Sequence, residues 1–114
     1  YHAHGECEQF HSEIKTDMDV ERLPSGKFDT NELVLELTIL AYNILRMIGQ
    51  ETIGRRKTRH KVKRRRLRTV ISNLVMMASH VTSHARQLII GLGKSNVWRH
   101  TFSEIYTAFA DFSL

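Results

Sequence analysis

Residues 29–49 read DTNELVLELTILAYNILRMIG, and this stretch decides the fold because apolar residues recur on most sides of a helix. Asp29 is placed to cap the helix N-terminus, with Glu32 three residues later as in a capping box. We therefore predict a helix that ends at about Ile48 or Gly49. A helix that is apolar nearly all round is buried on several sides. We expect this one to form the central core and to need covering by more protein than the rest of the chain supplies.

A shorter helix is predicted before it, from about Gly5 to Met18, followed by a loop whose turn signal is Leu23 to Gly26. Apolar side chains gather on one side of this helix, and most polar ones face solvent. We expect Cys7, Phe10, Ile14 and Met18 on the core side, and Glu6, Gln9, Glu13 and Thr16 on the solvent side.

One edge of the shorter helix carries an unusual set of polar residues at intervals of 3, 4, 3 and 4, namely Tyr1, His4, Glu8, His11 and Lys15. At ~100° per residue these side chains share a stripe about 80° wide. A tyrosine, a carboxylate and cationic groups on one face suit contact with a phosphodiester and a metal ion. The alternative is a solvated polar face without a function.

Charge is distributed unevenly along the 114 residues. Residues 1–51 hold four Lys/Arg and ten Asp/Glu, whereas residues 52–114 hold thirteen Lys/Arg and two Asp/Glu. Such asymmetry favours a polyanionic partner for the second half. Most of these cations lie in residues 55–68, here termed the basic segment: Arg55, Arg56, Lys57, Arg59, Lys61, Lys63, Arg64, Arg65, Arg66 and Arg68.

Contact with DNA phosphates is the favoured interpretation of the basic segment. A nuclear-localisation address and a solvated helix start are the alternatives. Apolar residues at intervals of 3 and 4 predict a helix that begins near Lys63 and continues to about Ala85, with its basic first turns pointing out of the fold. Residues 88–93 either end this helix or form one short strand near 87–92, and a last helix is capped by Ser95 or Asn96. The predicted fold class of this chain is mainly α.

Cys7 is the only cysteine, so an internal disulfide is impossible and a reducing, intracellular compartment is expected. No apolar run approaches the ~20 residues of a membrane span, so we expect no membrane partner. The first residue is Tyr1 rather than Met, and it lies inside the polar stripe. We therefore expect the chain to be part of a longer protein.

The polar stripe resembles a known signature. Its spacing Tyr1-x2-His4-x3-Glu8-x6-Lys15 is similar to Y-x2-R-x3-E-x6-K, which marks the C-terminal catalytic region of many bacterial insertion-sequence transposases of the DDE class. The text of residues 8–25 looks like that family too, as do the leucine-rich helix and the basic stretch before a further helix. The resemblance covers most of the chain.

The resemblance implies that this chain is the C-terminal part of an α/β RNase H-like catalytic domain. It implies that Glu8 is the catalytic glutamate and a ligand of one of two Mg²⁺ (or Mn²⁺) ions, together with two aspartates. The intact enzyme would hydrolyse DNA at transposon ends and join the strand to target DNA. It would act as a homodimer or larger assembly, associated with the nucleoid in the bacterial cytoplasm. Because both aspartates belong upstream of Tyr1, we expect this piece alone to be inactive. The DNA-contacting residues would be Tyr1, His4, Lys15 and the ten cations of the basic segment.

The sequence departs from the signature at His4, where the family has arginine. Histidine lacks the guanidinium fork and is only partly charged near pH 7, so phosphate contact there should be weaker and pH-dependent. Two other interpretations stay open. A zinc site could use His2, His4, Cys7 and His11, and a non-enzymatic basic helical module that binds nucleic acid would show the same charge asymmetry.

The predicted organisation has three parts. Residues 1–49 would hold the glutamate-bearing helix and the buried core helix, as the end of the RNase H-like domain. Residues 50–68 would form a basic loop and helix start, and residues 69–114 a C-terminal helical region.

Overall fold

The computed structural model of the protein describes the backbone of residues 2–55 and 62–112, and the side chains of these ranges from Gly5 onward. Along the chain, the elements are α1 (His2–Ser12), the π-helical turn η1 (Glu13–Asp17), α2 (Phe28–Arg55), α3 (Leu67–Val70), the π-helical turn η2 (Ile71–Val75), β1 (Ser79–His84), β2 (Gln87–Leu92) and α4 (Arg99–Ala110). The described part is thus mainly helical with one two-stranded antiparallel sheet. The mainly α class predicted for this chain is confirmed, and of the two alternatives for residues 88–93 the structure has the strand, while the RNase H-like architecture stays a prediction.

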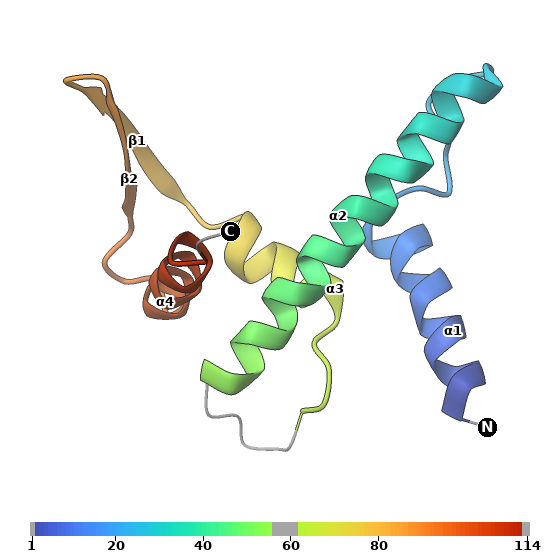
Figure 1. Ribbon diagram of the computed structural model, residues 1–114, viewed down its shortest axis with the longest axis horizontal. Coiled ribbons are helices and arrows are strands. Elements are labelled where there is room, and N and C mark those ends of the chain that lie inside the picture. The colour runs from blue at the N-terminus through green and yellow to red at the C-terminus, as the bar shows by residue number, and fades with distance from the viewer. Residues whose placement is uncertain (1, 56–61, 113–114) are drawn as a thin grey trace.

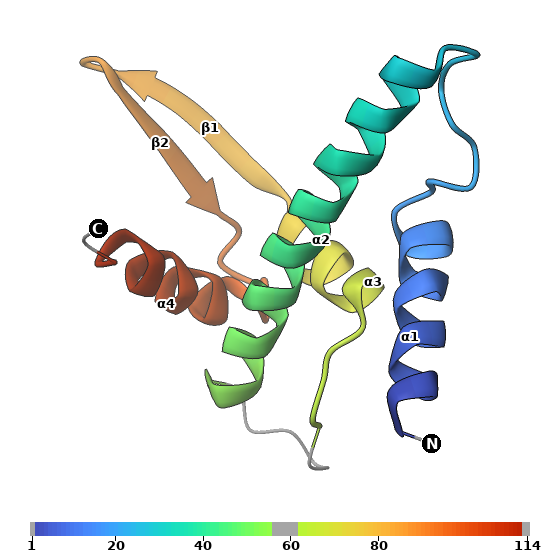
Figure 2. The same ribbon diagram turned by 45° about the vertical axis from the view of Figure 1, so that its right-hand side comes forward.

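The long helix α2 runs through the middle of the molecule (Figure 1). Both views place α1 on one side of it and α4 on the other, while α3 crosses it (Figures 1 and 2). The hairpin β1–β2 projects away from the helices. The radius of gyration is 16.9 Å, whereas a compact domain of this length has about 13 Å. The chain is therefore spread out around α2.

The hairpin corrects the prediction of one helix from Lys63 to Ala85. Helical structure ends with η2 at Val75, and β1 pairs with β2 from Ser79↔Leu92 to His84↔Gln87. Ala85 and Arg86 join the strands with φ angles of 49° and 63°, the left-handed conformation that two-residue hairpin turns of type I′ require. The apolar positions that predicted a helix continue into the strand, so their spacing alone did not show where the helix ends.

A small core lies where α3 and η2 cross α2 and α4. Val70, Leu74 and Ile105 form its buried centre, and Leu67, on the same short helix as Val70, is completely buried. Gly49 on α2 makes this crossing possible, because a Cβ atom there would lie 3.2 Å from Cγ2 of Val70. Half-buried side chains close the cluster, among them Leu45, Ile48, Met77, Trp98 and Phe102.

The ends of α2 differ from the prediction. The backbone N–H of Asn31 donates to the carbonyl of Lys27 over 3.2 Å, so the helix begins at Phe28 and Asp29 lies inside its first turn. The predicted capping box is therefore wrong, although a carboxylate in the first turn still suits the helix dipole. At the other end α2 continues to Arg55, beyond the predicted end at Ile48 or Gly49.

The expectation that α2 is buried on several sides is wrong for the structure described. Its buried residues are Tyr42, Gly49 and Thr52, all on one side. Another side carries a row of apolar side chains spaced 4, 3, 4 and 3 that are 49–58% exposed: Leu33, Leu37, Leu40, Ile44 and Met47. The whole chain exposes 9623 Å², about 3,000 Å² more than a compact monomer of its mass. An exposed apolar row of this kind is typical of a surface that binds another protein, a ligand or a membrane.

Candidate functional site

Glu8 lies on the exposed surface of α1, two residues before Phe10, the first half-buried side chain described on this helix. His11, also exposed, stacks edge-on against Phe10 with 5.5 Å between ring centroids. Lys15 is exposed but belongs to η1 rather than α1. Tyr1 lies outside the described residues, and the side chain of His4 lies outside them too. The structure thus brings Glu8 and His11 to one helix, and it leaves the full polar stripe a prediction.

The π-helical turn changes the geometry that the sequence predicted. The N–H of Met18 donates to the carbonyl of Glu13 over 3.1 Å, an i→i+5 bond that widens the turn. The 3.6-residue period used to place Lys15 and Glu13 therefore does not hold across residues 13–17. Phe10, Ile14 and Met18 lie half-buried as predicted, whereas Cys7 is exposed.

Glu13, expected on the solvent side, is 1% exposed and is the centre of a polar cluster. Its Oε1 accepts from the backbone N–H of Leu67 over 3.2 Å, and its Oε2 accepts from the hydroxyl of Tyr42 over 3.3 Å. The guanidinium of Arg64 donates to the same Oε2 and to Oη of Tyr42, the latter over 2.9 Å. Arg64 also donates to the side chain of Gln9, next to Glu8. These contacts define the Glu13 cluster: Gln9, Glu13, Tyr42, Arg64 and Leu67.

The Glu13 cluster is electrostatically consistent. Burial raises the pKa of Tyr42 above its ordinary value, so the phenol stays neutral and donates its hydrogen at physiological pH. The buried carboxylate of Glu13 is paired with a guanidinium and accepts two further hydrogen bonds, which is the arrangement that makes a buried charge tolerable. Phe10 covers one side, with its ring edge-on to Tyr42 at 4.9 Å.

A second ion pair lies one helical turn further along the chain. Arg66 donates to both carboxylate oxygens of Asp17, over 3.0 and 3.1 Å, and the N–H of Arg68 donates to Asp17 over 3.2 Å. Burial alone would raise the pKa of the Asp17 carboxyl, but the hydrogen bonds and the charge of Arg66 outweigh it and hold that pKa below its ordinary value. Asp17 is therefore ionised at neutral pH and joins η1 to the start of α3.

These contacts correct the expectation that the basic first turns point out of the fold. Arg64 and Arg65 are half-buried and point inward. Arg65 donates to Oγ1 of Thr52 over 2.5 Å and lies 5.2 Å from the ring centroid of Trp98. Arg55 pairs with Glu51 on its own helix over 3.2 Å. Lys63 and Arg68 are exposed, while Arg56, Lys57, Arg59 and Lys61 lie outside the described residues.

The family of the chain follows from comparison with known proteins. The family described as transposase DDE domain group 1 matches residues 1–113. The chain belongs to this family. No curated protein and no solved structure matches the chain. The resemblance to DDE transposases is therefore confirmed, and the narrower Y-x2-R-x3-E-x6-K signature group stays a prediction.

In this transposase DDE domain, no three or more His, Cys, Asp or Glu side chains gather where they could hold a metal ion within the described ranges. Of the zinc ligands considered, the side chains of His2 and His4 lie outside those ranges. Glu8 fits the donor type that Mg²⁺ prefers, an exposed carboxylate oxygen. Glu8 alone would supply one ligand, whereas the carboxylates of Glu13 and Asp17 are paired with arginines.

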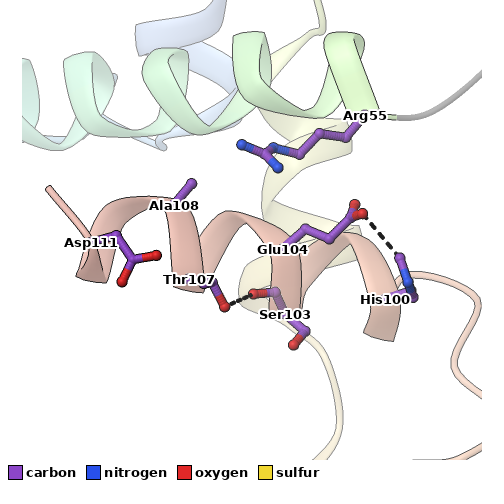
Figure 3. A pocket seen from close by; sticks show the side chains of 7 residues that line it. All are labelled: Arg55, His100, Ser103, Glu104, Thr107, Ala108 and Asp111. Carbon is purple, nitrogen blue, oxygen red and sulfur yellow. Dashed lines mark hydrogen bonds and ion pairs between the residues drawn. The ribbon is translucent and has the colours of Figure 1, made fainter.

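A shallow pocket between the end of α2 and α4 was not predicted from the sequence (Figure 3). It mixes charges of both signs: Arg55 from α2 faces Glu104 on α4, and Glu104 pairs with His100 over 3.5 Å. A phosphate-binding site is lined by positive charges, so this mixed lining does not fit one. Over residues 2–55 and 62–112, no helix is long and apolar enough to cross a membrane.

Proposed function

We propose that the chain is part of a DNA transposase that performs metal-dependent phosphodiester hydrolysis and strand transfer at transposon ends, with Glu8 as its catalytic glutamate. The observation that carries the proposal is an exposed carboxylate on a helix whose other end is tied into the fold, in a chain that belongs to a transposase DDE family. The site would belong to an RNase H-like domain to which residues 1–49 contribute, in a bacterial protein acting with the nucleoid.

In this proposal Glu8 provides one oxygen ligand for Mg²⁺ or Mn²⁺. The bound ions would activate the attacking oxygen and stabilise the leaving oxygen at the scissile phosphate. The other carboxylates would come from two aspartates upstream of Tyr1 in the parent protein, so the 114-residue chain alone would be inactive. What the chain itself does is hold Glu8 at a fixed place on α1.

The DNA surface in this proposal consists of Lys15, with Tyr1 and His4 of the polar stripe, and of six cations of the basic segment. Lys63 and Arg68 are exposed in the structure, and Arg56, Lys57, Arg59 and Lys61 complete the set by sequence. Arg55, Arg64, Arg65 and Arg66 were predicted in the same role, but each contacts another residue of the chain. We therefore give these four a supporting role.

The upstream part of the same transposase is the partner proposed for the apolar row on α2. Five large side chains about half exposed along one side of a helix are more than a monomer normally leaves in water. Their spacing of 4, 3, 4 and 3 is that of a helix face packed against one other layer. We also propose that the whole transposase forms a homodimer that holds two transposon ends.

A non-enzymatic module that binds nucleic acid is the second candidate. The excess of cations after Glu51 favours it, because phosphate contacts need no carboxylate. Both candidates predict the same dependence of DNA binding on salt, so only a measurement of DNA cleavage distinguishes them.

The decisive experiment compares two variants of the parent transposase in Mg²⁺-dependent cleavage of transposon-end DNA. Glu8→Gln should abolish cleavage, while the matched control Glu6→Gln, an exposed carboxylate on the same helix, should retain it. Cleavage by Glu8→Gln at the rate of the unmodified enzyme would exclude Glu8 as a catalytic residue and favour the second candidate.

A further inference from the structure

The helix that carries Glu8 contacts the rest of the described chain mainly near its C-terminal end. Residues 5–9 of α1 are exposed, and Phe10 is the first side chain that is half-buried. Phe10 meets Tyr42 edge-on, and the following turn η1 packs on α3. Both views show α1 extending away from this attachment point and diverging from α2 (Figures 1 and 2). The position of Glu8 therefore depends on whatever fixes residues 9–17.

We infer that Glu13 is the positioning residue for Glu8: with Tyr42, Arg64 and the N–H of Leu67 it forms a clamp that sets the direction of α1. This inference rests on the proposed catalytic role of Glu8. Glu13 is five residues from Glu8 on a continuous helical path, so a rotation at Glu13 is passed directly to Glu8. Arg64 adds a second hold on α1 through Gln9, the neighbour of Glu8.

The clamp joins three parts of the chain that are far apart in sequence. The hydroxyl of Tyr42 comes from the middle of α2, the guanidinium of Arg64 from the basic segment, and the N–H of Leu67 from the start of α3. Glu13 is the shared acceptor of all three. A carboxylate that accepts hydrogen bonds from three elements fixes the direction of its helix relative to them, whereas a lone ion pair would fix only the distance between two side chains.

The clamp also assigns a role to a residue predicted to touch DNA. Arg64 is 19% exposed in its side chain and is paired with a carboxylate that is 1% exposed. Releasing Arg64 to a phosphate would leave the buried charge of Glu13 uncompensated, which is strongly unfavourable. Arg64 therefore holds the active-site helix, and removing it should change turnover rather than DNA affinity.

The first test measures the direction of α1 in the full chain without any reaction. Cys7 is the only cysteine, is exposed and directly precedes Glu8, so it can carry a spin label. A second label at Asn43→Cys, on the exposed side of α2, gives the distance between the two helices. Glu13→Gln and Tyr42→Phe should broaden the distance distribution, and the control Glu6→Gln should leave it narrow.

The second test measures kcat and KM for Mg²⁺-dependent cleavage by the parent transposase. Because small displacements of a reacting group cost up to about 100-fold, Glu13→Gln should lower kcat by about 10- to 100-fold with KM for DNA unchanged. Tyr42→Phe removes the two hydrogen bonds of the hydroxyl, one donated to Glu13 and one accepted from Arg64, and should lower kcat by about 3- to 10-fold. Glu13→Gln should retain more activity than Glu13→Ala, since the amide oxygen can still accept from Leu67.

The outcomes separate this inference from the proposed function. Loss of cleavage in Glu8→Gln together with unchanged kcat and unchanged distances in Glu13→Gln and Tyr42→Phe would overturn the clamp and leave the catalytic assignment standing. Undiminished cleavage by Glu8→Gln would overturn the catalytic assignment, and broadened distances would then show a clamp that serves folding alone. If Glu13→Gln does not fold, Tyr42→Phe decides both measurements, because it keeps the ring that packs on Phe10.

Discussion

Replacing Gly49 with alanine tests whether α2 and α3 approach as closely as the structure shows. In a helix interior, Gly→Ala by itself stabilises by about 1 kcal/mol. At Gly49 the new methyl would lie 3.2 Å from Cγ2 of Val70, closer than the ~3.5–4.0 Å optimum for two carbon atoms. Val70 is 2% exposed, so moving it away from the new methyl would disturb its neighbours in the core, and the contact should cost about 1–3 kcal/mol. We expect Gly49→Ala to lower the free energy of unfolding by about 0–2 kcal/mol as the balance of these terms.

Gly54 on the same helix is the matched control. A Cβ at Gly54 would meet no atom of the described residues within 4 Å, so Gly54→Ala should raise the free energy of unfolding by about 0.5 kcal/mol, less than in mid-helix because Gly54 lies in the last turn of α2. Urea denaturation followed by the fluorescence of Trp98, the only tryptophan, measures both variants. Trp98 packs against the core, so its emission reports the same crossing.

A double-mutant cycle sharpens the test. In the Val70→Ala background, Cγ2 is absent and Gly49→Ala should be less destabilising by about 1 kcal/mol than in the unmodified chain. Equal stabilisation by Gly49→Ala and Gly54→Ala, with no coupling to Val70, would refute the close crossing of α2 and α3.

Three further predictions follow from the same contacts. Because the pKa of Asp17 is lowered in the folded state, the stability that its ionised carboxylate contributes should be complete above about pH 3.9 and be lost as the pH falls through the lower folded pKa. The check is to compare the urea midpoints of the unmodified chain and of Asp17→Asn between about pH 2 and 6. If both midpoints change with pH in the same way, the prediction is contradicted. Leu67→Ala should lower the free energy of unfolding by about 2–5 kcal/mol, measured by the same urea titration, because Leu67 is completely buried. Leu40 is 57% exposed, so Leu40→Ser should change the free energy of unfolding by less than about 0.5 kcal/mol and should reduce self-association measured by light scattering. If Leu40→Ser lowers the free energy of unfolding as much as Leu67→Ala does, the apolar row is packed within the chain.

Local sequence predicted those parts of the fold that local interactions determine. The helical class, the long helix around residues 29–49 and a last helix follow from periodicity, although this last helix begins at Arg99 rather than directly after a cap at Ser95 or Asn96. Periodicity left a helix end and a strand open for residues 88–93, and the structure has the strand. The hairpin was missed because its first strand continues the apolar spacing of the preceding helix. What ends the helix at Val75 is pairing with β2, a contact that periodicity does not contain.

For a similar reason, the sequence singled out Glu8 as a candidate site residue but not Glu13. Glu8 was found through its spacing from Lys15 and through family resemblance. Glu13 was assigned to the solvent side by the 3.6-residue period, yet its burial is decided by Arg64 and Leu67, more than fifty residues away. An acidic residue among other acids, and an arginine among ten cations, gave no signal that they were partners.

The separation of 54 residues between Glu13 and Leu67 has a consequence for synthesis of the protein. A ribosome adds about 5–20 residues per second, so several seconds pass between the emergence of Glu13 and that of its last partner. During this interval the proposed clamp on the helix of Glu8 is incomplete, and contacts of such long range also form late in folding. A chain released before Leu67 would thus carry Glu8, the proposed catalytic glutamate, without holding it in place, and in our proposal such an incomplete enzyme would not cut DNA.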